Sequence, residues 1–214
     1  MSLDKFEAHL KDPAPGFRCF RCEDREEKLD LLVRVYHTIE RRASQNSLVD
    51  LLVHLGNDFP EVRDFYSKHN GMKIYSNSTA NTNGIVFFPI KEWEDYTEVM
   101  RERFDFMDGV EETADFFKGV VFGEIHRSAN YFVFITEGPH KGAVYYADHD
   151  DVQRKPLAPS FGAFLESIVR DPAQFMYDRG CHVRYSDGKT RSQWIPKEYV
   201  ADVRPQQQAN EKPS

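Results

Sequence analysis

The sequence lacks an excess of basic residues and lacks long hydrophobic runs, and each absence excludes a class of protein. It has 28 lysines and arginines against 35 aspartates and glutamates, a net charge of −7. Because phosphate backbones attract basic surfaces, this balance argues against a general nucleic-acid binder. No apolar run approaches the roughly 18 residues that a membrane-spanning helix needs. We therefore expect neither nucleic acid nor a membrane as a direct partner.

Cysteine is also scarce, which indicates the compartment. The chain has three cysteines, an odd number and too few for a disulfide framework, as is typical of a reducing environment. The first seven residues lack the charged and then apolar pattern of a secretory signal. We therefore expect a soluble, cytoplasmic protein.

The cysteines leave one alternative open. Cys19 and Cys22 form a C-x-x-C pair, and Cys181 lies beside His182 far downstream. Three thiolates and an imidazole have the chemistry of a zinc site, but a zinc ribbon usually supplies a second close pair. Plain buried or surface cysteines are therefore favoured over zinc or redox chemistry, and we expect no metal and no cofactor.

Common catalytic motifs are missing as well. The chain contains no G-x-S-x-G and no G-x-G-x-x-G pattern. Gly188-Lys189-Thr190 resembles the end of a phosphate-binding loop, but that loop needs a glycine where this chain has Val183. No residue is nominated as a nucleophile or as half of an acid and base pair. We expect a protein that is not an enzyme, with a zinc-dependent hydrolase as the remote alternative.

Hydrophobic periodicity predicts helices at both ends of the chain body and one in its middle. Apolar side chains three and four residues apart indicate helices over residues 24–42, 47–55 and 60–69. Trp93, Tyr96, Met100 and Phe104 place the apolar face of another helix. Ser160 is a suitable N-cap for a further helix, and a shorter one follows over residues 172–180.

Strands are predicted between these helices. Runs of β-branched and aromatic residues occupy 85–89, 120–125, 131–136 and 143–147, and residues 181–185 with 193–195 suit a final hairpin. Several links are too short for a crossover helix, which favours an antiparallel meander. The fold class is therefore α+β, with helices packed against an antiparallel sheet. We expect a helical extension over 1–45, a domain over 46–203 and a disordered tail over 204–214.

Several short segments between Ser47 and Tyr177 resemble, in order and spacing, those of one known family. The segments are Leu55-Gly56-Asn57-Asp58-Phe59-Pro60, Phe65-Tyr66, His69-Asn70-Gly71, Phe88-Pro89-Ile90 with Glu92-Trp93, Gly123-Glu124-Ile125, Gly142-Ala143-Val144-Tyr145-Tyr146 with Asp148-His149-Asp150, Ser160-Phe161 and Phe164-Leu165. Together they resemble the SUKH superfamily and its Smi/Knr branch, named for a cell-wall-synthesis regulator. The resemblance implies an α+β fold and a non-enzymatic protein-binding module.

Negative charge is concentrated in one segment. From Lys91 to Asp115 the chain has ten acids and three bases, a net charge of −7 that equals the charge of the whole chain. On a helix these acids fall opposite the apolar residues. Such a stripe is either a solvated helix face or an acidic surface that mimics nucleic-acid phosphates and covers the basic cleft of a nuclease. The candidate partner-binding residues here are Glu92, Asp95, Glu98, Glu102, Glu111, Glu112 and Asp115.

A second acidic group follows a predicted strand. Asp148 and Asp150 stand at alternate positions, as carboxylates that converge on a hard cation often do. The segment lacks the glycine and the distal glutamate of a calcium loop, so a strand-end turn is favoured. In the family that this chain resembles, such a turn suits a binding surface, and we add Asp148 and Asp150 to the candidate partner-binding residues.

The resemblance also implies a role. Bacterial members look mostly like immunity proteins that neutralise a cognate toxin, often a nuclease, whereas eukaryotic members look like adaptors in signalling and cell-wall control. We therefore predict a bacterial immunity protein that occludes a basic, nuclease-type toxin. An intracellular adaptor or regulator is the alternative, and the oligomeric state stays open.

Overall fold

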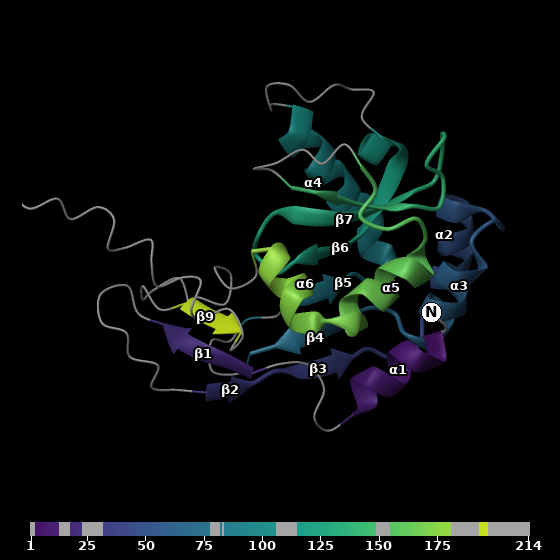
Figure 1. Ribbon diagram of the computed structural model, residues 1–214. Helices are drawn as coiled ribbons and strands as arrows, with labels where there is room; N and C mark the ends of the chain where they lie inside the picture. Colours follow the sequence, from purple (N-terminus) through teal and green to yellow (C-terminus); the bar gives the residue numbers. More distant parts are fainter. Residues whose placement is uncertain are drawn as a thin grey trace, which may run out of the picture.

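A six-stranded antiparallel sheet is the centre of the fold (Figure 1). The computed structural model describes residues 3–12, 18–22, 32–77, 82, 84–105, 115–148, 155–180 and 193–196. The strand order is β3-β4-β5-β6-β7-β8, and each pair of neighbours is antiparallel. The strands are Tyr36–Ile39 (β3), Met72–Ser76 (β4), Ile85–Phe87 (β5), Gly119–Ile125 (β6), Asn130–Ile135 (β7) and Val144–Ala147 (β8). The predicted α+β fold with an antiparallel meander is confirmed.

Helices surround this sheet. They are Leu3–Lys11 (α1), Gln45–Leu55 (α2), Pro60–Lys68 (α3), Trp93–Asp105 (α4), Phe161–Arg170 (α5) and Pro172–Asp178 (α6), with short 3₁₀ helices at Ile90–Glu92 (η1) and Asp115–Lys118 (η2). The side chain of Ser160 accepts a hydrogen bond from the backbone N–H of Ala163, so its predicted capping role is confirmed. Among the described residues, every helix is too short or too polar to pass through a lipid bilayer.

The two faces of the sheet differ. Successive residues of a strand point to opposite faces, so Phe87 and Phe132 lie on one face while Glu124 lies on the other. The rings of Phe87 and Phe132 pack on Phe164 of α5, with ring centroids 6.1 and 4.9 Å apart. Helices α5 and α6 therefore cover the apolar face, which is the front face in Figure 1. The face with Glu124 is covered in part by α4, which packs on β6.

Helix α1 contributes to the same core as the sheet. Phe6 is fully buried, and its ring lies 6.3 Å from that of Phe65 and 6.5 Å from that of Phe87. His9 Nε2 lies 3.2 Å from the hydroxyl oxygen of Tyr75 in β4. The predicted boundary at residue 45 stays a prediction, but α1 packs on elements that lie far along the chain.

The predicted helix over residues 24–42 is wrong where the structure describes it. Leu32–Arg34 is strand β2, and Tyr36–Ile39 is strand β3, which pairs with β4. The segment is rich in β-branched and aromatic residues, which suit a strand. Pairing with a distant strand outweighs the helical spacing of its apolar residues, because intrinsic helix propensity is weak. Residues 24–31 lie outside the described part.

A second, three-stranded sheet has the order β2-β1-β9. Its other strands are Arg18–Cys22 (β1) and Gln193–Pro196 (β9), and β2 continues through Val35 into β3 (Figure 1). The strand predicted over residues 193–195 is therefore confirmed, and its described partner is β1. The other half of the predicted hairpin, residues 181–185, lies outside the described residues, as does the tail over 204–214.

Candidate functional site

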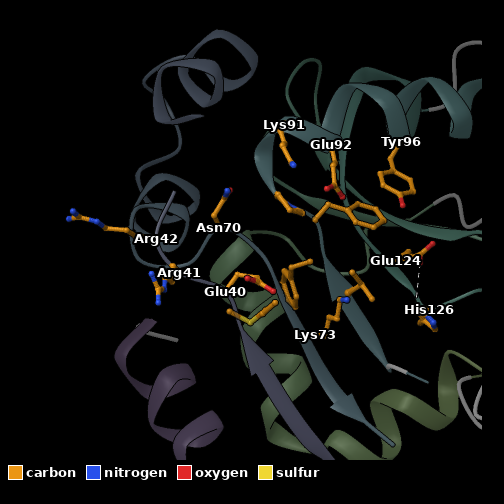
Figure 2. Close-up of a pocket in the computed structure, with 15 residues that line it drawn as sticks. Glu40, Arg41, Arg42, Asn70, Lys73, Lys91, Glu92, Tyr96, Glu124 and His126 are labelled. Carbon is orange, nitrogen blue, oxygen red and sulfur yellow. Dashed lines mark ion pairs between the residues drawn. The ribbon is translucent and has the colours of Figure 1, made fainter. Parts of the chain in front are cut away.

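A pocket of about 650 Å³ opens on the sheet face beside α4, and we call it the sheet pocket (Figure 2). Its apolar floor includes Val86, which is 8% exposed. Polar side chains enter from several elements: Lys73, Glu92, Tyr96, Glu124 and His126. The sheet pocket therefore combines an apolar floor with charged and aromatic walls, as small binding sites commonly do.

Strand register brings three of these residues into one row. Lys73 of β4 pairs with Val86 of β5, and Val86 pairs with Glu124 of β6. Directly paired residues project from the same face, so all three point into the pocket. The pocket wall at η1 is fixed separately, because the side-chain oxygen of Asn70 accepts a hydrogen bond from the backbone N–H of Ile90 at 3.2 Å. Residue Glu92 of η1 points into the pocket (Figure 2).

The aromatic wall is held rigidly from beneath. Tyr96 stacks on Phe88 with ring centroids 3.7 Å apart and planes within 5°. The carbonyl oxygen of Phe88 accepts hydrogen bonds from the hydroxyl of Tyr66 at 3.1 Å and from Nε1 of Trp93 at 3.2 Å. Burial raises the pKa of Tyr66, so its hydroxyl stays a donor. Two buried donors thus position the ring that supports Tyr96.

Glu124 has the most unusual environment in the pocket. Its side chain is 15% exposed, and burial raises its pKa to about 7, while the backbone N–H of Arg127 and the charge of Arg103 act in the opposite direction. The carboxylate oxygen lies 3.9 Å from Nδ1 of His126. Burial also lowers the pKa of His126, helped by the charges of Arg127 and Lys73. Near neutral pH, the protonated and the ionised forms of Glu124 are therefore both populated.

The raised pKa of Glu124 predicts a pH-dependent stability. Because the folded protein holds this proton more tightly than the unfolded chain, the free energy of unfolding falls as the pH rises from about 4.5 to about 7. Glutamine has no such proton, so Glu124→Gln removes this pH dependence. The change in the free energy of unfolding on Glu124→Gln is expected to be more favourable at pH 8 than at pH 5 by about 2 kcal/mol. Urea denaturation at the two pH values measures the difference. Equal effects at both would contradict the raised pKa.

The outer side of α4 is a separate feature, which we call the acidic face of α4. It consists of Asp95, Glu98 and Glu102, all exposed, on the side opposite the buried Trp93 and Phe104. Within the described part of the chain none of the three acids takes part in an ion pair or a hydrogen bond. This face therefore carries uncompensated negative charge.

The two basic residues of α4 interact with groups outside the acidic face. Arg101 donates from Nη2 to the carbonyl oxygen of Phe117 at 3.2 Å. Burial raises the pKa values of Glu124 and Tyr131, and the nearby positive charge of Arg103 lowers both, which offsets part of that rise. Neither arginine neutralises the acidic face of α4.

The remaining predicted partner-binding residues lie in different places. Glu92 is half-buried in η1 and lines the sheet pocket, away from the exposed acids of α4. Asp115 lies in η2, and Asp148 is half-buried just after β8. Three more residues lie outside the described part: Glu111, Glu112 and Asp150. The structure thus brings together Asp95, Glu98 and Glu102, and their role in binding stays a prediction.

Sequence reasoning missed the sheet pocket itself. Gly123-Glu124-Ile125 is predicted as a strand and forms one segment of the family resemblance, and neither His126 nor Lys73 is singled out from the sequence. One signal was available, because Glu124 is the single charged residue in the otherwise apolar strand Gly119–Ile125. Charged side chains are seldom buried without a reason, and such a residue is a candidate for a binding site.

The cysteine alternative receives no support from the described residues. Among them no group of three or more His, Cys, Asp or Glu side chains is placed to hold a metal ion. Cys19 and Cys22 lie in β1, and Cys181 lies outside the described part. The expected absence of a metal stays a prediction.

Comparison with known proteins identifies the family. The sequence model of the SMI1 / KNR4 family (SUKH-1) matches residues 42–167, more than half of the chain. This segment contains α2 to α4, β4 to β8, the acidic face of α4 and all the residues of the sheet pocket except Glu40 and Arg41. No curated protein sequence matches the chain. The family is generally non-catalytic. The chain therefore belongs to the SMI1 / KNR4 (SUKH-1) family.

Proposed function

We propose that this protein is a non-enzymatic protein-binding module, an immunity protein that neutralises a basic, nuclease-type toxin by covering its cleft. The observation that carries the proposal is the acidic face of α4, where three exposed acids lack a basic partner among the described residues. A nuclease needs a basic cleft to hold its phosphate backbone. The proposed mechanism is occlusion, in which no covalent bond is made or broken.

Electrostatics explains why an unpaired acidic face suits this role. Opposite charge on two proteins raises the rate of encounter and orients the partners before contact. An inhibitor that must capture a toxin before it reaches nucleic acid benefits from fast association. Acids already paired with lysine or arginine attract a basic partner less, and among the described residues Asp95, Glu98 and Glu102 have no such pairing.

A second candidate function, an adaptor of the cell-wall-regulator type, is favoured by another surface. Helix α2 exposes Val49, Leu52 and Val53, at 51%, 37% and 79%. Residues three and four apart lie on one helix face, so these form a small apolar stripe. An adaptor that joins several partners would use two surfaces of different chemistry. Capture of several unrelated proteins, with modest affinity, would favour this candidate over the immunity protein.

Charge reversal on α4 tests the proposed function. Asp95→Lys combined with Glu98→Lys is expected to weaken binding to the cognate toxin at least tenfold in low salt, chiefly through slower association. The toxin is sought as the product of the gene directly upstream. Binding is measured by surface plasmon resonance at two salt concentrations, and protection by survival of cells that express the toxin.

A control variant separates position from net charge. Asp50→Lys combined with Glu137→Lys makes the same change in charge at two exposed positions outside α4. This control is expected to keep most of the affinity and full protection. If both pairs weakened binding equally, or if neither did, the acidic face of α4 would not be the docking surface.

A further inference from the structure

We propose that the corner of the sheet pocket formed by Glu92, Tyr96 and Glu124 binds one arginine side chain of a protein partner. The inference rests on the proposed function in one respect, that the partner is a basic protein. It assigns the sheet pocket, which lies apart from the acidic face of α4, to a single cationic group.

Glu124 supplies the first reason. Its carboxylate is largely removed from water, yet within the described part of the chain its one ion-pair contact is with His126 at 3.9 Å. Burial lowers the pKa of His126, so this imidazole is a weak cation near neutral pH. A guanidinium group would offer two parallel N–H donors to such a carboxylate. A fully charged cation would therefore stabilise the ionised carboxylate of Glu124 more than His126 does.

Tyr96 and Glu92 supply the second reason. Burial, together with the negative charges of Glu124 and Glu92, raises the pKa of Tyr96, which places both carboxylates near this ring. Figure 2 shows Glu92 and the hydroxyl of Tyr96 directed into the pocket from η1 and α4, with Glu124 below them on β6. A cation at this corner would lie between two carboxylates and beside an aromatic ring.

The shape of the corner favours arginine over lysine. A planar guanidinium stacks on aromatic rings and pairs with carboxylates through two bonds, whereas an ammonium group does neither. The ring of Tyr96 is held flat by its stack on Phe88. The apolar floor at Val86 suits the methylene groups of the arginine stem.

Resident cations determine how the ligand would lie. Lys73 is in the same cross-strand row as Glu124 but two strands away, roughly 10 Å. Lys91, Arg41 and Arg42 also line the pocket, and Figure 2 shows the two arginines on the side away from Glu124. The charge of Arg103 acts on Glu124 from outside the pocket, whereas Arg127 acts through a backbone hydrogen bond. The ligand's positive charge would therefore point to β6, and a neutral or acidic part would lie over β4.

The environment of Glu124 makes this binding pH-dependent. A cation prefers the ionised carboxylate, and a group whose pKa is about 7 is mostly ionised at pH 8 and mostly protonated at pH 6. Affinity is therefore expected to fall about tenfold from pH 8 to pH 6. Protonation of His126 on the same strand acts in the same direction, since it adds a like charge. By linkage, the bound cation lowers the pKa of Glu124.

A small probe tests the corner without the toxin. The full chain, with ¹³C-labelled glutamate, is titrated with Nα-acetyl-arginine amide and followed by NMR of the side-chain carboxyl groups. We expect the Glu124 signal to shift, with a dissociation constant on the order of millimolar. The neutral isostere Nα-acetyl-citrulline amide is expected to bind at least tenfold more weakly.

Variants locate the effect. Glu124→Gln, followed through the carboxyl signal of Glu92, is expected to weaken binding of the arginine amide at least tenfold at pH 8, and Tyr96→Leu several-fold. Glu137→Gln is the matched control, because it also removes one carboxylate charge from the protein at an exposed position outside both the sheet pocket and the acidic face of α4, and it is expected to bind as the wild type does. Thermal unfolding of each variant checks that it is folded.

The outcomes separate this inference from the proposed function. If the arginine amide leaves Glu124 unchanged, or if citrulline amide binds as well, the inference is wrong even where the toxin still binds. If the arginine amide binds as expected but reversal of Asp95 and Glu98 leaves toxin affinity intact, the proposed function of the acidic face is wrong and the arginine site stands.

Discussion

Replacing Trp93 with alanine is expected to lower the free energy of unfolding by about 3–5 kcal/mol, as truncation of a fully buried aromatic residue does. Trp93 is fully buried, and its ring meets that of Tyr66 edge to face at a centroid distance of 5.0 Å. The change leaves a large cavity between α3 and α4. It also removes the hydrogen bond from Nε1 to the carbonyl oxygen of Phe88.

The effect of this substitution extends to the sheet pocket. The carbonyl oxygen of Phe88 would keep only the hydroxyl of Tyr66 as a side-chain donor, and Phe88 carries the ring on which Tyr96 stacks. We therefore expect weaker binding of the arginine amide in addition to lower stability. Urea denaturation measures the stability.

Two controls bracket this prediction. Trp93→Phe keeps most of the buried area and loses the hydrogen bond, so it is expected to cost about 1–2 kcal/mol. Val53→Ala removes methyl groups from a side chain that is 79% exposed and is expected to change stability by less than about 0.5 kcal/mol. A loss below 1 kcal/mol in Trp93→Ala would contradict the packing described for α4.

Substitution of Gly123 by alanine is expected to cost about 3 kcal/mol or more. A Cβ atom at this position would lie 2.5 Å from the carbonyl oxygen of Val86 and 3.5 Å from Cα of Phe87. Both are backbone atoms of β5 in the middle of the sheet, so no side-chain rotation relieves the clash. Strands β5 and β6 must separate, and overpacking of this kind costs about 1–3 kcal/mol or more.

Gly56→Ala is the matched control for Gly123→Ala. Gly56 has a φ of 65°, and nothing lies within 4 Å of an added Cβ atom. With a ψ of −153° it lies in a region that is used almost only by glycine, so its cost is backbone strain alone, about 1–3 kcal/mol. Chemical denaturation compares the two variants. If Gly123→Ala were no more destabilising than Gly56→Ala, the close approach of β5 to β6 would be wrong.

Local signals explain which helices could be predicted. Helix α3 begins at Pro60 and α5 at the residue after Ser160, and both start signals act within one turn of chain. The buried side of α4 follows from the spacing of its own apolar residues. The exposed side of α4 could be predicted for the same reason. Once the apolar residues fix the buried side of the helix, the acids must lie on the opposite side.

Strand β4 was missed because its alternation is short. Met72, Lys73 and Ile74 alternate between buried and exposed, but the next residues, Tyr75 and Ser76, are both buried. Tyr75 has a φ of 56°, which breaks the two-residue period of a strand. A pattern of three residues does not distinguish a strand from a loop, and its pairing partners β3 and β5 lie elsewhere in the chain.

The sheet pocket could not be predicted because no single segment contains it. Its walls come from β4, β6, η1 and α4, and the pKa of Glu124 depends on burial that these elements create together. The sequence shows only one acid in an apolar strand. The helix predicted over residues 24–42 failed for a related reason, since its strand partner begins at Met72.

The position of Phe6 has a consequence for how the protein is made. During synthesis α1 leaves the ribosome before the other described elements, but its partners include Phe87 of β5 and helix α5, which begins at Phe161. At typical translation rates, roughly 10–30 s separate Phe6 from the first residue of α5. A nine-residue helix is not stable alone in water. The nascent chain therefore exposes an apolar segment, to which a chaperone can bind, until α5 has been translated.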